Sequence, residues 1–281
     1  QGALELNTPD TTICPGSSLE LKVANTSKSM FANPSAVADQ HYYYKNHVPG
    51  MNIQNDLTLE FWIKPTDIQF QSMVLAKGVN FIVWHMGATN TLKFEITNVN
   101  DQIIEYESAN PIPLNEWTHV AIVKDLFPKR VKFYFNGALD VAHIPTLNLK
   151  AKAPASRFQV GDVFGTAGVS FDELRVWNKV LTPTEIAEWM NKSLDSSHTS
   201  YSTLRYYFTF EEDQSLVVDH SSFGFDLVPF DNPQIVEESP WHSGLDFTWS
   251  TGQLGYEITV APENTTTYSV TYNNGSNNCS D

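Results

Sequence analysis

The sequence predicts an all-β protein, an antiparallel β-sandwich with one short helix. The chain has 281 residues, and aromatic residues, which pack well on the pleated surface of a sheet, make up 12% of them. Many short segments alternate between apolar and polar residues with the two-residue period of a half-buried strand. Turn residues separate these segments at short intervals, a spacing that is typical of sandwiches and barrels.

The strand pattern is clear in several segments along the chain. They span residues 57–63, 81–86, 92–96, 117–123 and 131–135. Asn136-Gly137 follows the last of them directly, and Asn-Gly is the strongest two-residue signal for a hairpin turn. Trp62, Trp117 and Trp177 fall at positions where the alternation predicts burial. We therefore expect a run of short strands joined by tight turns.

One helix is predicted over residues 182–191. Thr182 is placed as the N-cap, Pro183 at the first helical position and Glu185 at the third. This is a capping box with a proline where its missing N–H costs nothing. Apolar residues recur at helical spacing from Ile186 onward, so we expect a short helix that lies on the sandwich as a brace.

Four longer stretches follow one another in a characteristic order. They are residues 57–65, 115–137, 171–186 and 207–222. The third is the most specific, because it runs from the strand Phe171-Asp-Glu-Leu-Arg-Val-Trp177 directly into the capped helix. Together they resemble the laminin-G-like, concanavalin A-like domains of large bacterial surface proteins. The resemblance implies an antiparallel jelly-roll sandwich over residues 29–242.

The two ends of the chain resemble a different family. The stretches concerned are residues 12–21, 247–252, 256–262 and 265–271. They are similar to immunoglobulin-like repeats in secreted proteins of the Bacteroidetes type, in which such pieces are almost contiguous. The resemblance implies that residues 1–28 and 243–281 form one small immunoglobulin-like β-sandwich, with the jelly roll inserted into an exposed loop between them.

The chain has two cysteines, Cys14 and Cys279. The proposed insertion places both in the same small domain, so a disulfide between them is one expectation in an oxidising compartment. Two unpaired cysteines near the chain ends are the alternative.

Composition narrows the range of partners. The formal net charge of −15 opposes binding to nucleic acids or to anionic membranes, since both require a basic face. No run of about 18 apolar residues is present, so no membrane-spanning helix is expected. The family resemblance implies a secreted or cell-surface location.

Motifs of common hydrolases are absent from the sequence. There is no His-Glu-x-x-His zinc motif and no Gly-x-Ser-x-Gly elbow. Some concanavalin-like proteins are glycosidases, and the related laminarinase-like enzymes carry their acids in a Glu-x-Asp-x-x-Glu strand that is missing here. The acidic residues 211–213, and Glu105 with Glu107, are interpreted as surface charges. The sequence therefore favours a non-catalytic protein.

Calcium is the cofactor that the family resemblance implies, bound at a rim of the sandwich by aspartates and backbone carbonyls. The candidate ligands are Asp39, Asp172 and Asp219. If Asp172 faces inward, it needs a partner, which is calcium, an arginine or backbone N–H groups. Asp39 and Asp219 are predicted near turns, where an aspartate also caps the turn without any metal.

Glycan binding is the sharper functional hypothesis, because sugars are held by aromatic faces and a few directional polar groups. The candidates are Tyr43, Trp84, His85, Phe127 and Phe164. Tyr43 belongs to a run of three tyrosines, of which at least one is expected to be exposed. Trp84 and His85 are adjacent, so only one of them faces a given surface. Phe127 and Phe164 lie in predicted loops, where binding residues concentrate.

The sequence thus predicts a binding or adhesion module of a secreted or cell-surface bacterial protein, with a polysaccharide or cell-surface glycan as its partner. An architectural or protein-docking module without a small ligand is the first alternative. A glycoside hydrolase is the less favoured second alternative.

Overall fold

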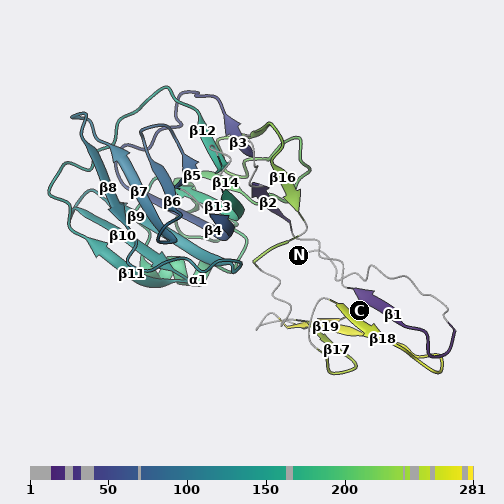
Figure 1. Cartoon of the computed structure of the whole chain (residues 1–281). Helices are drawn as coiled ribbons and strands as arrows, with labels where there is room; N and C mark the ends of the chain where they lie inside the picture. Colours follow the sequence, from purple (N-terminus) through teal and green to yellow (C-terminus); the bar gives the residue numbers. More distant parts are fainter. Residues whose placement is uncertain are drawn as a thin grey trace. The chain divides into compact units, whose positions relative to one another are not determined.

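The protein forms two compact units in the computed structural model (Figure 1). The structure describes residues 14–22, 28–32, 41–68, 71–162, 167–236, 238–240, 247–253, 257–273 and 278–280. The larger unit is Ser29–Val236, and the smaller unit combines Gln1–Lys28 with Glu237–Asp281. The larger unit ends with its last strand at Val236, whereas the sequence placed that boundary at residue 242.

The larger unit contains a sheet of seven strands in the order β15-β3-β12-β5-β6-β7-β8. The bounds are β3 (His41–Lys45), β5 (Ser72–Ala76), β6 (Ile82–Met86), β7 (Thr91–Thr97), β8 (Ile103–Glu107), β12 (Phe158–Asp162) and β15 (Val228–Phe230). All neighbouring strands in this sheet are antiparallel.

The second sheet follows the order β11-β10-β9-β4-β13-β2-β16, and β14 also pairs with β13. The bounds are β2 (Ser29–Ala32), β4 (Leu57–Ile68), β9 (Thr118–Asp125), β10 (Arg130–Phe135), β11 (Ala138–His143), β13 (Ala167–Trp177), β14 (Leu204–Phe208) and β16 (Gln234–Val236). Strands far apart in the sequence, such as β4 and β13, are neighbours here, as the crossovers of a jelly roll require.

The apolar positions of the alternating strands meet between the two sheets. Leu59, Phe61 and Ile63 of β4 are fully buried in the same core as Leu92 and Phe94 of β7. The polar positions of these strands point away from this core because successive side chains point to opposite faces. The structure therefore confirms the predicted antiparallel jelly-roll sandwich.

Helix α1 (Pro183–Trp189) covers the face of the second sheet that points away from the core. Ile186 of the helix packs there against Ala121, Trp177 and Tyr207 of the sheet. The predicted capping box is present, because the Thr182 side chain accepts a hydrogen bond from the Glu185 backbone N–H at 3.1 Å and the Glu185 carboxylate accepts one from the Thr182 N–H at 2.8 Å. A short 3-10 helix, η1 (Tyr201–Thr203), follows in the chain.

The smaller unit is built from both ends of the chain. Its strands are β1 (Leu19–Lys22), β17 (Phe247–Trp249), β18 (Glu257–Val260), β19 (Val270–Asn273) and β20 (Asn278–Ser280). β1 pairs with β18, and β17, β19 and β20 form a second small sheet. Leu21, Trp249, Ile258, Val260 and Val270 form one buried cluster, so the beginning and the end of the chain share a core. That this unit is an immunoglobulin-like repeat stays a prediction.

Cys14 is exposed and has a free thiol in the structure. The side chain of Cys279 lies outside the described residues, so the disulfide stays a prediction. None of the helices formed by the described residues has the length and hydropathy of a membrane span.

Candidate functional site

The seven-stranded sheet has a face that points away from the core, and we call this surface the outer face. The register of the strands places one residue of each strand in a continuous row across it, because directly opposite residues of an antiparallel pair point to the same side. This row is Val228, Tyr44, Gln159, Ala76, Ile82, Glu95 and Glu105. Helix α1 packs on the second sheet, and not on this outer face.

Trp84 of β6 lies on the outer face and is partly exposed. Its indole Nε1 donates a hydrogen bond to Glu95 Oε2 at 3.0 Å. Lys93 Nζ lies 5.5 Å from the centroid of the indole ring, within the range of a cation–π contact. The same ammonium group pairs with Glu105 Oε1 at 2.9 Å. These contacts fix the orientation of the indole and surround it with charged groups.

Glu95 and Glu105 lie opposite each other on β7 and β8. Burial raises the pKa of Glu95, and the hydrogen bond from Lys93 lowers the pKa of Glu105. Two carboxyl groups whose pKa values are moved apart are typical of an acid–base pair. Here, however, Glu105 is held by Lys93 and Glu95 accepts the Trp84 N–H, so both carboxyl groups already have partners within the protein.

A second aromatic group on the outer face surrounds Arg157, the residue before β12. Tyr42 of β3 stacks on Phe230 of β15 with ring centroids 4.8 Å apart. The Arg157 guanidinium carbon lies 5.2 Å from the Tyr42 centroid and 5.6 Å from the Tyr44 centroid. Phe230 is 40% exposed, so this group also reaches the surface.

The aromatic residues predicted to bind a ligand lie at different places in the structure and differ in exposure. Trp84 lies on the outer face, whereas Phe127 is 83% exposed in the loop between β9 and β10 of the other sheet. Tyr43 is fully buried in the core, where its hydroxyl donates a hydrogen bond to the Gln214 carbonyl at 3.1 Å. Phe164 lies outside the described residues.

The ligand-binding roles predicted for Tyr43 and His85 are therefore corrected. His85 is fully buried opposite Leu92, and this burial lowers its pKa to about 4. The reason in both cases is the two-residue period of a strand: the outward position is Trp84 on β6, and on β3 it is Tyr42 and Tyr44. The sequence did not indicate which tyrosines of the run point outward, and Arg157 was missed because it follows no recognisable motif.

The predicted calcium ligands are engaged within the chain. Asp219 Oδ1 accepts the backbone N–H groups of Tyr207 and Ser221, each at 2.9 Å. Its Oδ2 accepts the Ser221 hydroxyl and the Phe225 N–H, each at 2.8 Å. Asp172 is buried, and its Oδ1 accepts the Glu173 N–H at 2.7 Å.

Calcium takes six to eight oxygen ligands, and the described residues contain no cluster of three or more His, Cys, Asp or Glu side chains that could hold a metal ion. Asp172 and Asp219, as they stand, do not fit such a site. Asp39 lies outside the described residues. Calcium stays a prediction of the family resemblance, and a melting temperature that is higher in calcium than in a chelator would support it.

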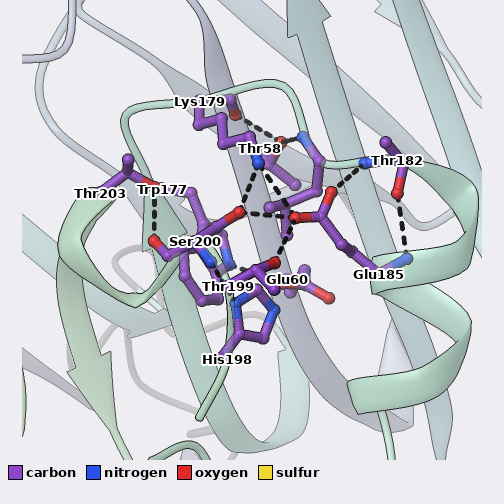
Figure 2. A network of polar contacts seen from close by, with 11 residues as sticks. Thr58, Glu60, Trp177, Lys179, Thr182, Glu185, His198, Thr199, Ser200 and Thr203 are labelled. Atoms are coloured by element: carbon purple, nitrogen blue, oxygen red, sulfur yellow. Dashed lines mark hydrogen bonds and ion pairs between the residues drawn. The ribbon is translucent and has the colours of Figure 1, made fainter. Parts of the chain in front are cut away.

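A buried polar network lies beneath α1 on the second sheet (Figure 2). Glu60 of β4 accepts the Trp177 indole N–H at 2.6 Å, and its other oxygen lies 3.8 Å from His119 Nε2. Burial raises the pKa of Glu60 to about 7 and lowers that of His119 to about 3. Glu185 of the helix accepts a hydrogen bond from the Ser200 hydroxyl at 2.5 Å. This network pins the helix and the loop after it to the sheet, and its burial makes it unsuitable for binding a glycan.

The sequence matches the family described as "Concanavalin A-like lectin/glucanases superfamily" over residues 38–187. Among solved structures, a "putative carbohydrate binding protein" from Bacteroides ovatus has a TM-score of 0.59 at 15% identity, over 80% of this chain and 70% of that chain. This likeness concerns the fold.

Two further solved structures are more distant. The heptameric SAP-like pentraxin from Limulus polyphemus has a TM-score of 0.49 at 14% identity, over 75% of this chain and 95% of that chain. The binding domain of Paraclostridial Mosquitocidal Protein 1 has a TM-score of 0.49 at 14% identity, over 67% of this chain and 47% of that chain. No curated protein matches the sequence significantly.

Proposed function

Because the chain belongs to the concanavalin A-like lectin/glucanase superfamily, we propose that it is a non-catalytic binding module that holds a carbohydrate on the outer face of its seven-stranded sheet. The surroundings of Trp84 support this proposal most directly. The indole is partly exposed, it is held in orientation by Glu95 and Lys93, and hydrogen-bonding groups lie beside it. A flat apolar ring beside a few directional polar groups is the combination that orients a small polar ligand such as a sugar.

Binding is favoured over hydrolysis by the state of the two carboxyl groups on this face. A glycosidase needs one carboxyl group free to donate a proton to the leaving oxygen and a second free to attack or to activate water. Glu105 is neutralised by Lys93, and Glu95 accepts the Trp84 N–H. These residues serve better as hydrogen-bonding partners for sugar hydroxyl groups than as catalysts.

The name of the Bacteroides ovatus structure is consistent with a carbohydrate ligand. In this proposal the jelly roll belongs to a secreted or cell-surface bacterial protein, and the smaller unit is an immunoglobulin-like repeat that carries it. Its partner is then a polysaccharide or a cell-surface glycan.

The test is a glycan array followed by calorimetry with the retained sugar, using wild type, Trp84→Ala and Phe127→Ala. Phe127 is a matched control because it is an exposed aromatic residue on the other sheet. We expect Trp84→Ala to weaken binding roughly tenfold or more, since one aromatic contact is worth up to ~1.5 kcal/mol beyond the area that it buries. Phe127→Ala should bind like wild type.

Equal loss in both variants would place the ligand elsewhere or indicate misfolding, which far-UV circular dichroism separates. Retention of no glycan, together with capture of a protein partner, would favour the docking alternative. Release of oligosaccharides from β-glucans would show that the protein is an enzyme.

A further inference from the structure

Arg157 lies against two tyrosine rings, and part of its hydrogen-bonding edge is available for a ligand. Its guanidinium group lies 5.2 Å from the Tyr42 ring centroid and 5.6 Å from that of Tyr44. An arginine over an aromatic ring uses the face of its planar group for the contact. The N–H groups lie in the plane of the guanidinium group. One side of this fork interacts with the Tyr42 hydroxyl, and the remaining N–H groups can bond an acceptor such as a carboxylate.

The positive charge of Arg157 has no counter-ion within the described chain. No described carboxylate forms an ion pair with it, although the chain has 32 acidic residues against 17 Lys and Arg. Lys93 and Lys152 differ from Arg157 in this respect, because Lys93 pairs with Glu105 and Lys152 pairs with Asp101. A cation held between aromatic rings without an acidic partner is a ready binding group for an anion.

Gln159 supplies a second, independent observation. It lies directly opposite Tyr44 on the outer face and is only 7% exposed, yet its Nε2 has no hydrogen-bond partner among the described residues. A buried amide N–H without an acceptor destabilises the fold, so such a group calls for an acceptor. Arg157 lies beside the Tyr44 ring, and Gln159 is paired with Tyr44 across the two strands, so both residues border the same side chain.

We infer that the glycan bound on the outer face carries a carboxylate, and that Arg157 holds this carboxylate beside Tyr42 and Tyr44. The inference rests on the proposed glycan-binding function and specifies its ligand class. A guanidinium fork matches a carboxylate better than it matches sugar hydroxyl groups. The overall charge of −15 repels acidic glycans at long range, so any preference for them must come from a local group of this kind.

The experiment uses pairs of probes that differ only in the carboxylate. Sialyllactose is compared with lactose, and polygalacturonate with its carboxyl-reduced form, so that sialic acid and uronic acid are tested separately. Binding is measured by calorimetry or affinity electrophoresis for wild type, Arg157→Met and Arg130→Met. Methionine keeps an apolar stem against the tyrosines, and Arg130 is a control because it lies on β10 of the other sheet.

We expect wild type and Arg130→Met to bind at least one carboxylated probe more tightly than its neutral counterpart. The expected ratio is roughly tenfold to a hundredfold, the range of one hydrogen-bonded charged contact. Arg157→Met should lose this ratio and retain the affinity for the neutral form. Trp84→Ala should weaken both forms, because it removes the aromatic contact and leaves Arg157 in place.

The outcomes separate the inference from the function on which it rests. Equal affinity of wild type for both members of each pair, or an unchanged ratio in Arg157→Met, overturns the carboxylate inference and leaves glycan binding intact. Retention of none of these probes, and of no neutral glycan on the array, overturns both.

Discussion

Glu60 shows how far burial moves the chemistry of a single side chain. It lies on the face of the second sheet beneath α1 and is 1% exposed. It accepts a hydrogen bond at 2.6 Å from the neutral Trp177 N–H. His119, which lies 3.8 Å from its other oxygen, is kept neutral by burial. Loss of water around the carboxylate therefore outweighs the nearby charge of Arg175, and the pKa rises to about 7.

This shift predicts a pH-dependent stability. From about pH 4.5 to about pH 7 the folded protein keeps the Glu60 proton that the unfolded chain has already lost. The free energy of unfolding therefore falls as pH rises through this window, by about 3 kcal/mol. Glu60→Gln mimics the protonated acid and should remove this loss, so the variant should match wild type at pH 5 and exceed it at pH 8.

The measurement is urea denaturation of wild type and Glu60→Gln at pH values from 5 to 8. Buried His119 has the opposite effect on stability: because its pKa is lowered, it destabilises the folded protein increasingly as pH falls below 6.5. This effect is present in both proteins and cancels in the comparison. Glu188→Gln on the exposed side of α1 serves as the control. A constant stability difference between Glu60→Gln and wild type at all pH values would contradict the raised pKa.

The sequence of helix α1 contains both features that stabilise it, a capping box and a buried apolar residue. Seven residues are too few for an isolated helix to be stable, so the helix depends on its cap and on Ile186, which is fully buried against the sheet. The cap is also tied to the segment before the helix and to the loop after it, because Glu185 bonds to Thr182, Lys179 and Ser200 at once. These bonds lower the pKa of Glu185 to about 2 although burial opposes the change.

Thr182→Ala should therefore destabilise the larger unit by about 1 kcal/mol, the usual cost of losing a helix N-cap side chain. The reason is that the Glu185 backbone N–H loses its acceptor. Thr184→Ala is the matched control, since Thr184 is exposed within the helix and alanine has the higher helix propensity. Chemical denaturation followed by tryptophan fluorescence measures both, and equal stability of the two variants would show that the cap does not hold the helix.

The outer face is a product of sheet register. Its residues come from strands as far apart in the sequence as β3 and β15, and only strand pairing places Tyr44, Gln159 and Glu95 in one row. A shift of one residue in any strand would replace the outward side chain by a core side chain. The surface that we propose for glycan binding therefore depends on the same register that packs the core.

At the scale of the whole molecule, the described residues form two units, and the core of the smaller unit contains far fewer residues than that of the larger. The smaller core contains Leu21 from one end of the chain and Val270 from the other. Trp249 is its largest member and is 1% exposed. A core built from so few buried residues has little stability to lose.

Trp249→Ala should therefore unfold the smaller unit without unfolding the jelly roll. Loss of a buried tryptophan costs about 3–5 kcal/mol, which is comparable with the whole stability of a small unit. We expect scanning calorimetry of the wild type to show two unfolding transitions, with the smaller unit unfolding at the lower temperature. In Trp249→Ala this lower transition should be reduced or lost, and the transition of the jelly roll should be unchanged. Trp189→Ala, at the edge of the cluster beneath α1, should affect only the transition that Trp249→Ala leaves intact. One common transition that both variants lower equally would contradict two independent cores.

Local patterns in the sequence were sufficient for the fold class. The alternation at residues 57–63 and 92–96 predicts strands because a strand places successive side chains on opposite faces, whatever it packs against. The capping box at Thr182 and Glu185 is confirmed for the same reason, since its hydrogen bonds join residues three positions apart. The family resemblance supplied the jelly-roll connections between these elements.

Only the tertiary structure decided what each face is used for. The alternation predicts that Trp84 and His85 face opposite sides, but it does not say which of them is buried. The pairing of β6 with β7 in the folded sheet places Trp84 outward and buries His85. Trp177 is buried as expected, yet beneath α1 and outside the core between the sheets. Arg157 and Tyr44 are brought into contact by strand pairing across more than a hundred residues. A period of two assigns alternate residues to two faces, but which face meets the partner sheet is set by contacts between distant parts of the chain.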